Sequence, residues 1–255
     1  MRARITLLLF AILYSFTCLA QTNFEKHFTK KSLRIDFALS GNWDFQAAAI
    51  QQLREEPVWA GPVKNLIDPF GYGGYYINVY DKAGKELIYS RGFNTLFEEW
   101  RSTEQAKTET QSWTNSISIP YPKAPVIIEI TARDKADMQF HPLLKQEIDP
   151  ASIFIDRGKL KENRITKIQY NGDSSGKVDL VFLAEGYTAD EQEKFVADAK
   201  RFTEALFRTP PYDTRREDFN VWAVDAVSEE SGTDVSGKGI FKNTALNSGY
   251  YTFGV

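Results

Sequence analysis

The sequence predicts an α+β protein of two domains, an N-terminal antiparallel β-sandwich followed by a truncated α/β domain with a β-α-β unit. Two patterns favour this fold class. In the first half, short stretches alternate between apolar and polar side chains, as half-buried strands do. Beyond residue 176 the pattern becomes an apolar run, a helical spacing and a second apolar run, which is typical of a parallel sheet with helices on its faces.

The strands of the predicted sandwich can be placed along the first half of the chain. Residues 33–39 alternate and end at Ser40-Gly41-Asn42, which predicts a strand followed by a turn. The other predicted strands are residues 75–80 and 86–89, paired as a hairpin, and residues 113–119 and 126–130, paired around a connection whose three prolines keep it out of a ladder. The weaker segments, residues 47–53 and 94–100, predict short helical turns.

A β-α-β unit is predicted in the second half. Residues 178–184 are almost continuously apolar, as in a strand covered on both faces. Thr188 and Glu191 have the spacing of a capping box, which predicts a helix start. Four apolar residues at helical spacing predict the buried face of this helix: Phe195, Ala199, Phe202 and Leu206. Pro210-Pro211 ends the helix, and residues 219–224 predict the second strand.

The predicted organisation has four parts. These are a signal peptide at residues 1–20, the β-sandwich domain at 21–150, a linker with bridging strands at 151–176, and the start of the α/β domain at 177–255. The bridging strands are expected at residues 153–155 and 165–170. A two-stranded sheet with one helix would leave much apolar surface bare, so we expect the last domain to be incomplete.

The first twenty residues have the three parts of a secretory signal in the right order. Arg2 and Arg4 precede the apolar residues 5–13, and small side chains allow cleavage between Ala20 and Gln21. A transmembrane anchor is the alternative, but the apolar core is shorter than the roughly 20 residues that a bilayer requires. The sequence therefore predicts a protein that is secreted, periplasmic or on the cell surface, without a membrane anchor after cleavage.

The single cysteine, Cys18, lies within this segment. A lipid anchor on it is a second alternative, but Ser15 and Thr17 do not fit the aliphatic and small positions of a lipoprotein signal. Cleavage after residue 20 removes the only thiol together with two arginines, which takes the formal net charge from −3 to −5. A mildly acidic chain without a basic patch has no electrostatic footprint for nucleic acid.

Two acidic loops follow the predicted strands of the β-α-β unit, where ligands gather in open α/β sheets. One loop carries Glu185, and the other carries Asp225, Glu230 and Asp234. Oxygen ligands at this density could hold Ca²⁺ or Mg²⁺, although the spacing differs from that of an EF-hand. The alternative is a solvated loop whose carboxylates form turns.

The sequence assigns no catalytic residue. Catalytic zinc commonly has three protein ligands, but the only histidines, His27 and His141, are far apart in the first half. No His-Glu-x-x-His segment and no Gly-x-Ser-x-Gly segment is present, and Gly71-Tyr72-Gly73-Gly74 precedes a strand instead of opening a helix. We therefore expect no cofactor in this chain.

The β-α-β unit resembles the opening of the IgA-peptidase family of zinc metallopeptidases, family M64. The residues that carry the resemblance are 178–188, Pro210 to Tyr212, 219–224, 230–234 and 243–247. The resemblance implies a β-rich N-terminal domain, a protein or peptide substrate, and a zinc site on a His-Glu-x-x-His helix that would lie beyond Val255 in the full-length parent. It implies that the chain is an inactive N-terminal fragment of a secreted zinc peptidase.

A function from another class stays open. The chain contains 18 Phe, 12 Tyr and 5 Trp, which fits a packed β-rich core but also the surface of a binding protein. The alternative is therefore a secreted, non-catalytic β-sandwich module that binds protein or glycan.

Overall fold

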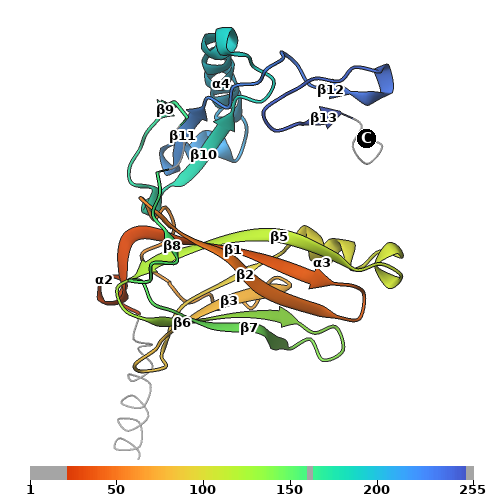
Figure 1. Ribbon diagram of the computed structural model, residues 1–255. Coiled ribbons are helices and arrows are strands. Elements are labelled where there is room, and N and C mark those ends of the chain that lie inside the picture. The colour runs from red at the N-terminus through yellow and green to blue at the C-terminus, as the bar shows by residue number, and fades with distance from the viewer. Residues whose placement is uncertain (1–21, 160–162, 251–255) are drawn as a thin grey trace, which may run out of the picture. The chain divides into compact units, whose positions relative to one another are not determined.

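The computed structural model describes residues 22–159 and 163–250, and the chain divides into two compact units between Gly158 and Lys159 (Figure 1). The boundary lies within the linker predicted at 151–176. The predicted signal peptide, with its cut between Ala20 and Gln21, lies outside the described residues. The structure is mostly β with few helices, which confirms the predicted two-domain α+β class.

The first unit is a sandwich of two four-stranded sheets. One sheet has the order β5 (Gln111–Pro122), β1 (Phe28–Gly41), β2 (Gln46–Glu56) and β8 (Ile155–Asp156). The other has the order β4 (Leu87–Phe93), β3 (Tyr75–Asp81), β6 (Val126–Arg133) and β7 (Phe140–Ile148). Neighbouring strands are antiparallel except β2 and β8, so the predicted antiparallel sandwich is confirmed.

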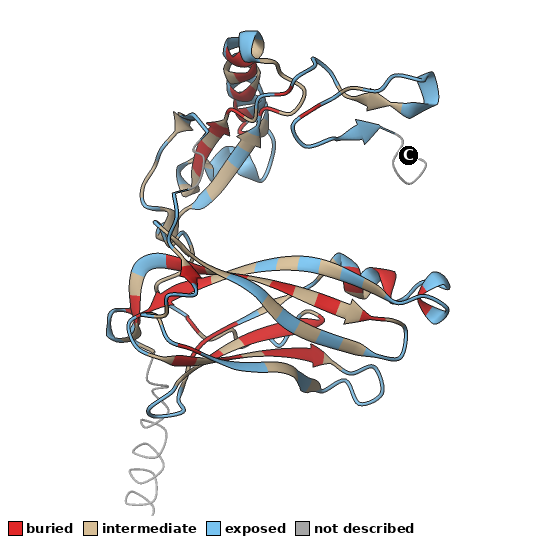
Figure 2. Cartoon of the chain, in the orientation of Figure 1, coloured by how far each residue is buried: buried red, intermediate tan, exposed pale blue. Residues whose placement is uncertain are grey.

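The core of the first unit lies between these sheets. From Leu33 onward, every second residue of β1 points into it, and Figure 2 shows this alternation of buried and more exposed residues. The inward side chains Leu33, Ile35, Phe37 and Leu39 are all 0 % exposed. They meet the inward residues Ile77 of β3 and Ile128 of β6 in one apolar cluster. The alternation seen in the sequence therefore identified the buried face correctly.

The prediction of helical turns at residues 47–53 is wrong, because this segment is the strand β2. The turn predicted at Ser40-Gly41-Asn42 is confirmed, because the Asn42 side chain accepts the N–H groups of Asp44 and Phe45, both at 3.0 Å. β2 then pairs with β1 along most of its length. The other predicted helical turn is confirmed as α3 (Leu96–Trp100), which begins where Thr95 accepts the N–H of Glu98.

The predicted pairing of residues 113–119 with 126–130 is also wrong. β5 pairs with β1, whereas β6 lies between β3 and β7 in the other sheet, so the connection crosses from sheet to sheet. Pro120 and Pro122 belong to the β5 ladder, opposite Ser32 and Phe28. They are tolerated because β5 is an edge strand, where a missing N–H can face solvent.

The second unit contains the predicted β-α-β unit. Its sheet has the order β10 (Val178–Leu183), β11 (Phe219–Val224) and β9 (Ile165–Gln169), and α4 (Gln192–Leu206) connects β10 to β11. β10 and β11 are parallel, whereas β9 is antiparallel to β11, so the sheet is mixed and not purely parallel as expected. Of the two predicted bridging strands, β8 belongs to the first unit and β9 to the second.

The predicted capping box lies in the 3-10 turn Ala189–Glu191 that leads into α4, where the N–H of Thr188 donates to Oε2 of Glu191 at 3.0 Å. The buried face of α4 is narrower than predicted. Phe195 and Ala199 are buried, but Phe202 is 50 % exposed, and Thr203 lies on the buried face in its place. Residue 203 continues the i, i+4 series from 195 and 199, so it lies closer than residue 202 to the sheet-facing side.

β10 is not covered on both faces, as its apolar run had predicted. Val178, Val181 and Leu183 are 54 %, 48 % and 48 % exposed, and the buried cluster of this unit contains few residues. An apolar run by itself does not distinguish a strand covered on both faces from one covered on a single face.

The remaining elements are short. They are α2 (Phe24–His27), the parallel pair β12 (Asp234–Val235) and β13 (Gly249–Tyr250), and the 3-10 turns Gln105–Lys107, Ser174–Gly176, Ala189–Glu191, Tyr212–Thr214, Arg216–Asp218 and Ser236–Lys238. Among the described helices, none is long and apolar enough to cross a bilayer.

Candidate functional site

The two predicted acidic loops lie at the carboxyl ends of the parallel strands. β10 ends at Leu183 and β11 at Val224, and these two residues are register partners. Glu185 therefore follows one strand end and Asp225 the neighbouring one. This is the edge at which open α/β sheets bind ligands, so its side chains are the first candidates for a site.

Glu185 organises this edge by holding a distant segment of the chain. Its Oε1 accepts a hydrogen bond from the Thr244 hydroxyl and one from the N–H of Ser248 at 2.9 Å, and its Oε2 accepts the N–H of Leu246 at 2.7 Å. Burial by itself would raise the pKa of Glu185, but the hydrogen bonds from Thr244, Ser248 and Leu246 outweigh it and hold this pKa at about 2. The carboxylate is therefore ionised at neutral pH.

Ser228 forms a second connection between the same segments. Its side chain is buried, and its Oγ accepts the N–H groups of Gly186 and Ala245, both at 3.0 Å. Gly186 has a φ of +75°, and a Cβ there would lie 2.2 Å from the carbonyl oxygen of Gly232. Only glycine permits this close approach of the two loops.

Glu230 and Asp234 hold the other end of the segment. Oε2 of Glu230 accepts the N–H of Asn243 at 2.7 Å, and its Oε1 lies 3.4 Å from Nζ of Lys242. These two contacts hold the pKa of Glu230 below its usual range, the Asn243 hydrogen bond being the larger cause. Oδ1 of Asp234 accepts the N–H of Lys242 at 2.6 Å. Each carboxylate thus fixes the backbone of residues 242–243.

Asp225 stands apart from this set. Its side chain is almost fully buried, and Oδ2 accepts a hydrogen bond from Nε of Arg164 at 2.7 Å. Its Oδ1 is buried without a hydrogen-bond partner. Glu185, Glu230 and Asp234 thus all hold one loop, residues 242–248. Asp225 is bound instead to Arg164, the residue before β9.

Two family models match the chain, one in each unit. The peptidase M64 N-terminus model matches residues 23–143, and the IgA peptidase M64 model matches residues 166–255. The chain belongs to the M64 peptidase family. No curated protein matches the chain. The family that the residues of the β-α-β unit indicated is therefore confirmed. The match to the IgA peptidase M64 model lies in the second unit.

The residues of this M64 chain do not fit the zinc that the family resemblance implies. Within residues 22–159 and 163–250, no group of three or more His, Cys, Asp or Glu side chains is placed to hold a metal ion. Both histidines, His27 and His141, belong to the first unit. Of the four carboxylates, only Asp225 has a buried oxygen without a partner, and a single oxygen is too few for a catalytic zinc site.

The Glu185 carboxylate at the strand ends is suited to holding a loop and is poorly suited to general acid–base catalysis. A general acid or base works best with a pKa near the operating pH, whereas the pKa of Glu185 is about 2. Both oxygens of Glu185 already accept hydrogen bonds from within the chain. We therefore assign Glu185 the role of holding residues 244–248 at the carboxyl end of β10.

Acid is expected to release this loop. Because the pKa of Glu185 falls from 4.5 to about 2 on folding, its stabilisation is fully present above about pH 4.5 and is lost as the pH falls towards 2. The shift corresponds to about 3 kcal/mol, and partial exposure of the group reduces this to about 2 kcal/mol. The amide proton shifts of Leu246 and Ser248, followed by NMR from pH 6 downwards, should titrate with a midpoint near pH 2. A midpoint near 4.5 would contradict the assignment.

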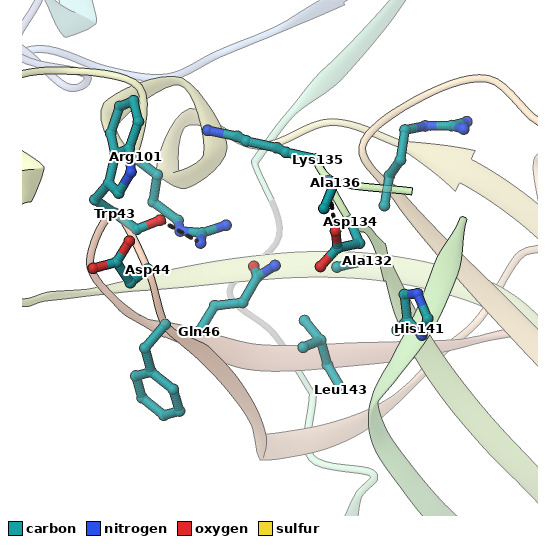
Figure 3. Close-up of a pocket in the computed structure, with 12 residues that line it drawn as sticks. Trp43, Asp44, Gln46, Arg101, Ala132, Asp134, Lys135, Ala136, His141 and Leu143 are labelled. Atoms are coloured by element: carbon teal, nitrogen blue, oxygen red, sulfur yellow. Dashed lines mark hydrogen bonds between the residues drawn. The ribbon is translucent and has the colours of Figure 1, made fainter. Parts of the chain in front are cut away.

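A second candidate lies in the first unit, where a cavity of about 420 Å³ opens at the end of the sandwich (Figure 3). The turn between β1 and β2, the residue after α3 and the loop between β6 and β7 form its walls. Its polar and aromatic lining includes Trp43, Asp44, Gln46, Arg101, Asp134 and His141. Nε2 of His141 lies 2.8 Å from Oδ2 of Asp137, so a carboxylate already partners this imidazole.

Sequence reasoning missed the residues that complete both candidates. Ser228 and Thr244 look like ordinary loop residues, and only the fold shows that they contact Glu185 or its neighbour. The sequence also gave no reason to connect Gln46 with Arg101, because residues so far apart meet only through the sandwich. The one usable signal was that acidic residues follow both parallel strands.

Proposed function

We propose that this chain is the N-terminal portion of a secreted zinc endopeptidase that hydrolyses peptide bonds in protein or peptide substrates. The observation that carries the proposal is the M64 peptidase match over residues 166–255, on a β-α-β unit whose strand ends carry an ordered loop. On this proposal the zinc ligands belong to chain beyond these residues, because the sequence contains no His-Glu-x-x-His segment.

Export is part of the same proposal. The basic start, short apolar run and small residues before Gln21 support a cleaved signal peptide. After cleavage the chain has no cysteine and therefore cannot form a disulfide. Its stability would come from the buried core of the sandwich. The mature protein would then act outside the cytoplasm. N-terminal sequencing of the exported protein should begin at Gln21.

The peptidase proposal is tested on the longest protein product of the gene. We expect the reading frame to continue past codon 255 and to encode His-Glu-x-x-His, and the purified product to hold one zinc per chain and to cleave casein until a chelator is added. The matched control is the chain of residues 21–255, which should contain no stoichiometric zinc and show no chelator-sensitive cleavage. An extension without the motif would refute the peptidase parent, and zinc-dependent cleavage by residues 21–255 would refute the inactive fragment.

A further inference from the structure

We propose that the cavity at the end of the sandwich binds an α-carboxylate next to an apolar side chain, as found at the C-terminus of a peptide or in a free amino acid. The cavity lies wholly within the first unit, so this inference is independent of the proposed peptidase activity. Its volume of about 420 Å³ is within the range of small-molecule sites, about 300–1,000 Å³.

Arg101 supplies the main positive charge of the cavity. This residue is only 8 % exposed, and its guanidinium donates to the carbonyl oxygens of Asn42 at 2.7 Å and Trp43 at 3.1 Å. It forms no ion pair with any carboxylate of the described residues. A buried cation without a counter-ion is costly, so an anion that enters the cavity offsets charge that the protein leaves uncompensated.

Gln46 presents a second donor next to Arg101. Its Oε1 accepts a hydrogen bond from the hydroxyl of Tyr75 at 2.9 Å, which leaves the Nε2 amide hydrogens for a ligand. Figure 3 shows the Gln46 amide and the Arg101 guanidinium on the same side of the cavity, facing Asp134 and His141. A carboxylate can accept hydrogen bonds from both.

The rim adds a second cation. Lys135 lines the cavity and its Nζ lies 4.8 Å from the centre of the Trp43 ring. The guanidinium of Arg133 donates to the carbonyl oxygens of Gly73, Met138 and Gly71 and lies over Phe140, none of which lines the cavity, so we do not count its charge. The charged groups at the cavity are thus two cations, Arg101 and Lys135, and two carboxylates, those of Asp44 and Asp134.

The opposite wall suits the rest of an amino-acid unit. Oδ1 of Asp134 accepts the N–H of Ala136 at 2.6 Å, which leaves the second oxygen to accept an N–H from a ligand. Leu143 and Ala132 line the same cavity, and Phe45 lies at its edge with 60 % of its surface exposed. Donors on one wall, a carboxylate on the other and apolar side chains between them match the three parts of a terminal residue.

The test compares ligands that differ only at the carboxylate. Binding of acetyl-Ala-Ala-Leu to the purified chain is measured by calorimetry, and the NMR signal of the Trp43 indole N–H locates the site. We expect the free acid to bind at least about tenfold more tightly than its C-terminal amide, because hydrogen bonds to a charged group are the stronger ones. Free leucine distinguishes the two sources: equal binding identifies a free amino acid, and weaker binding identifies a peptide C-terminus.

The matched variants are Gln46→Glu and Gln51→Glu. Both add the same charge to the same strand, but Gln51 is exposed and does not line the cavity. A glutamate at position 46 can still accept from Tyr75 while it repels a ligand carboxylate, so we expect binding to weaken about tenfold or more, with no change in the Gln51 variant. Lys135→Gln, at the rim of the cavity, should weaken binding by about threefold.

Several results would overturn this inference. They are the absence of binding by any of these probes, equal binding of the acid and the amide, tighter binding of inorganic phosphate than of the acid, or unchanged binding by a folded Gln46→Glu variant. Far-UV circular dichroism of each variant establishes whether it is folded. If the Gln46→Glu variant does not fold, the Lys135→Gln variant provides the test, and unchanged binding by that variant would overturn the inference.

Discussion

Replacing Phe37 with alanine is expected to destabilise the sandwich unit by about 3–5 kcal/mol. Phe37 is 0 % exposed and lies on the inward face of β1. Its ring packs against that of Phe93 in the opposite sheet, with centroids 6.0 Å apart and planes at 79°. The substitution removes the buried ring and leaves a cavity between two sheets that cannot easily close, because each is held by its own backbone ladder.

Urea unfolding followed by far-UV circular dichroism measures this loss in the free energy of unfolding. The matched control is Phe154→Ala in the same unit, where the side chain is 85 % exposed. We expect this control to change the stability by no more than about 0.5 kcal/mol. A loss below about 1 kcal/mol for the Phe37 variant would contradict the assignment of this residue to the centre of the core.

Replacing Glu185 with glutamine is expected to detach residues 244–248 from the end of β10. Glutamine has nearly the same shape but no charge, and one of its two terminal atoms donates hydrogen bonds. That atom would face Leu246 N–H, or the Thr244 and Ser248 donors, instead of accepting from them. Hydrogen bonds to charged groups contribute about 1.5–3 kcal/mol, so we expect local opening to become easier by about 2 kcal/mol.

Native-state amide hydrogen exchange measures the opening, and about 2 kcal/mol corresponds to a roughly 30-fold faster exchange of the Leu246 and Ser248 amides. Glu217→Gln is the matched control in the same unit, because this side chain is exposed and makes no hydrogen bond within the described residues. Exchange rates that change equally in both variants would show that the effect comes from overall charge and not from the contacts of Glu185.

The neighbouring strands β1 and β2 of the first unit differ in how far the sequence determined them. The alternation of residues 33–39 predicted both the strand β1 and its buried face, because an inward side chain every second residue is a local property of an extended chain. Residues 47–53 lack a strong pattern of their own. They became the strand β2 because the turn at Asn42 places them beside β1, whose backbone groups they then satisfy.

Pairing between strands depended on the tertiary structure. The segments on either side of Pro120 and Pro122 looked like neighbours because a short connection usually joins paired strands. They belong to different sheets, since β6 buries its inward residues best between β3 and β7. Nothing local in the sequence encodes which of two sheets a strand joins.

The candidate sites show the same division. The sequence identified the carboxylates Glu185, Asp225, Glu230 and Asp234 as a group at the ends of parallel strands, because strand order and direction follow from the β-α-β pattern. It could not assign their partners. Glu185 and Leu246 are 61 residues apart, so their hydrogen bond exists only after the intervening chain has folded. Gln46 and Arg101 are 55 residues apart and line one cavity for the same reason.

The sequence by itself determined the family, the two-part α+β organisation, the buried face of β1, the capping box of α4 and the β-α-β unit. All of these depend on side-chain spacing within one segment. The tertiary structure decided which strands pair and left apolar side chains of β10 exposed. It also decided that Glu185, whose pKa is about 2, holds residues 244–248, and that Arg101 and Gln46 line one cavity. These features arise from burial and from hydrogen bonds between distant segments, which no local pattern of residues specifies.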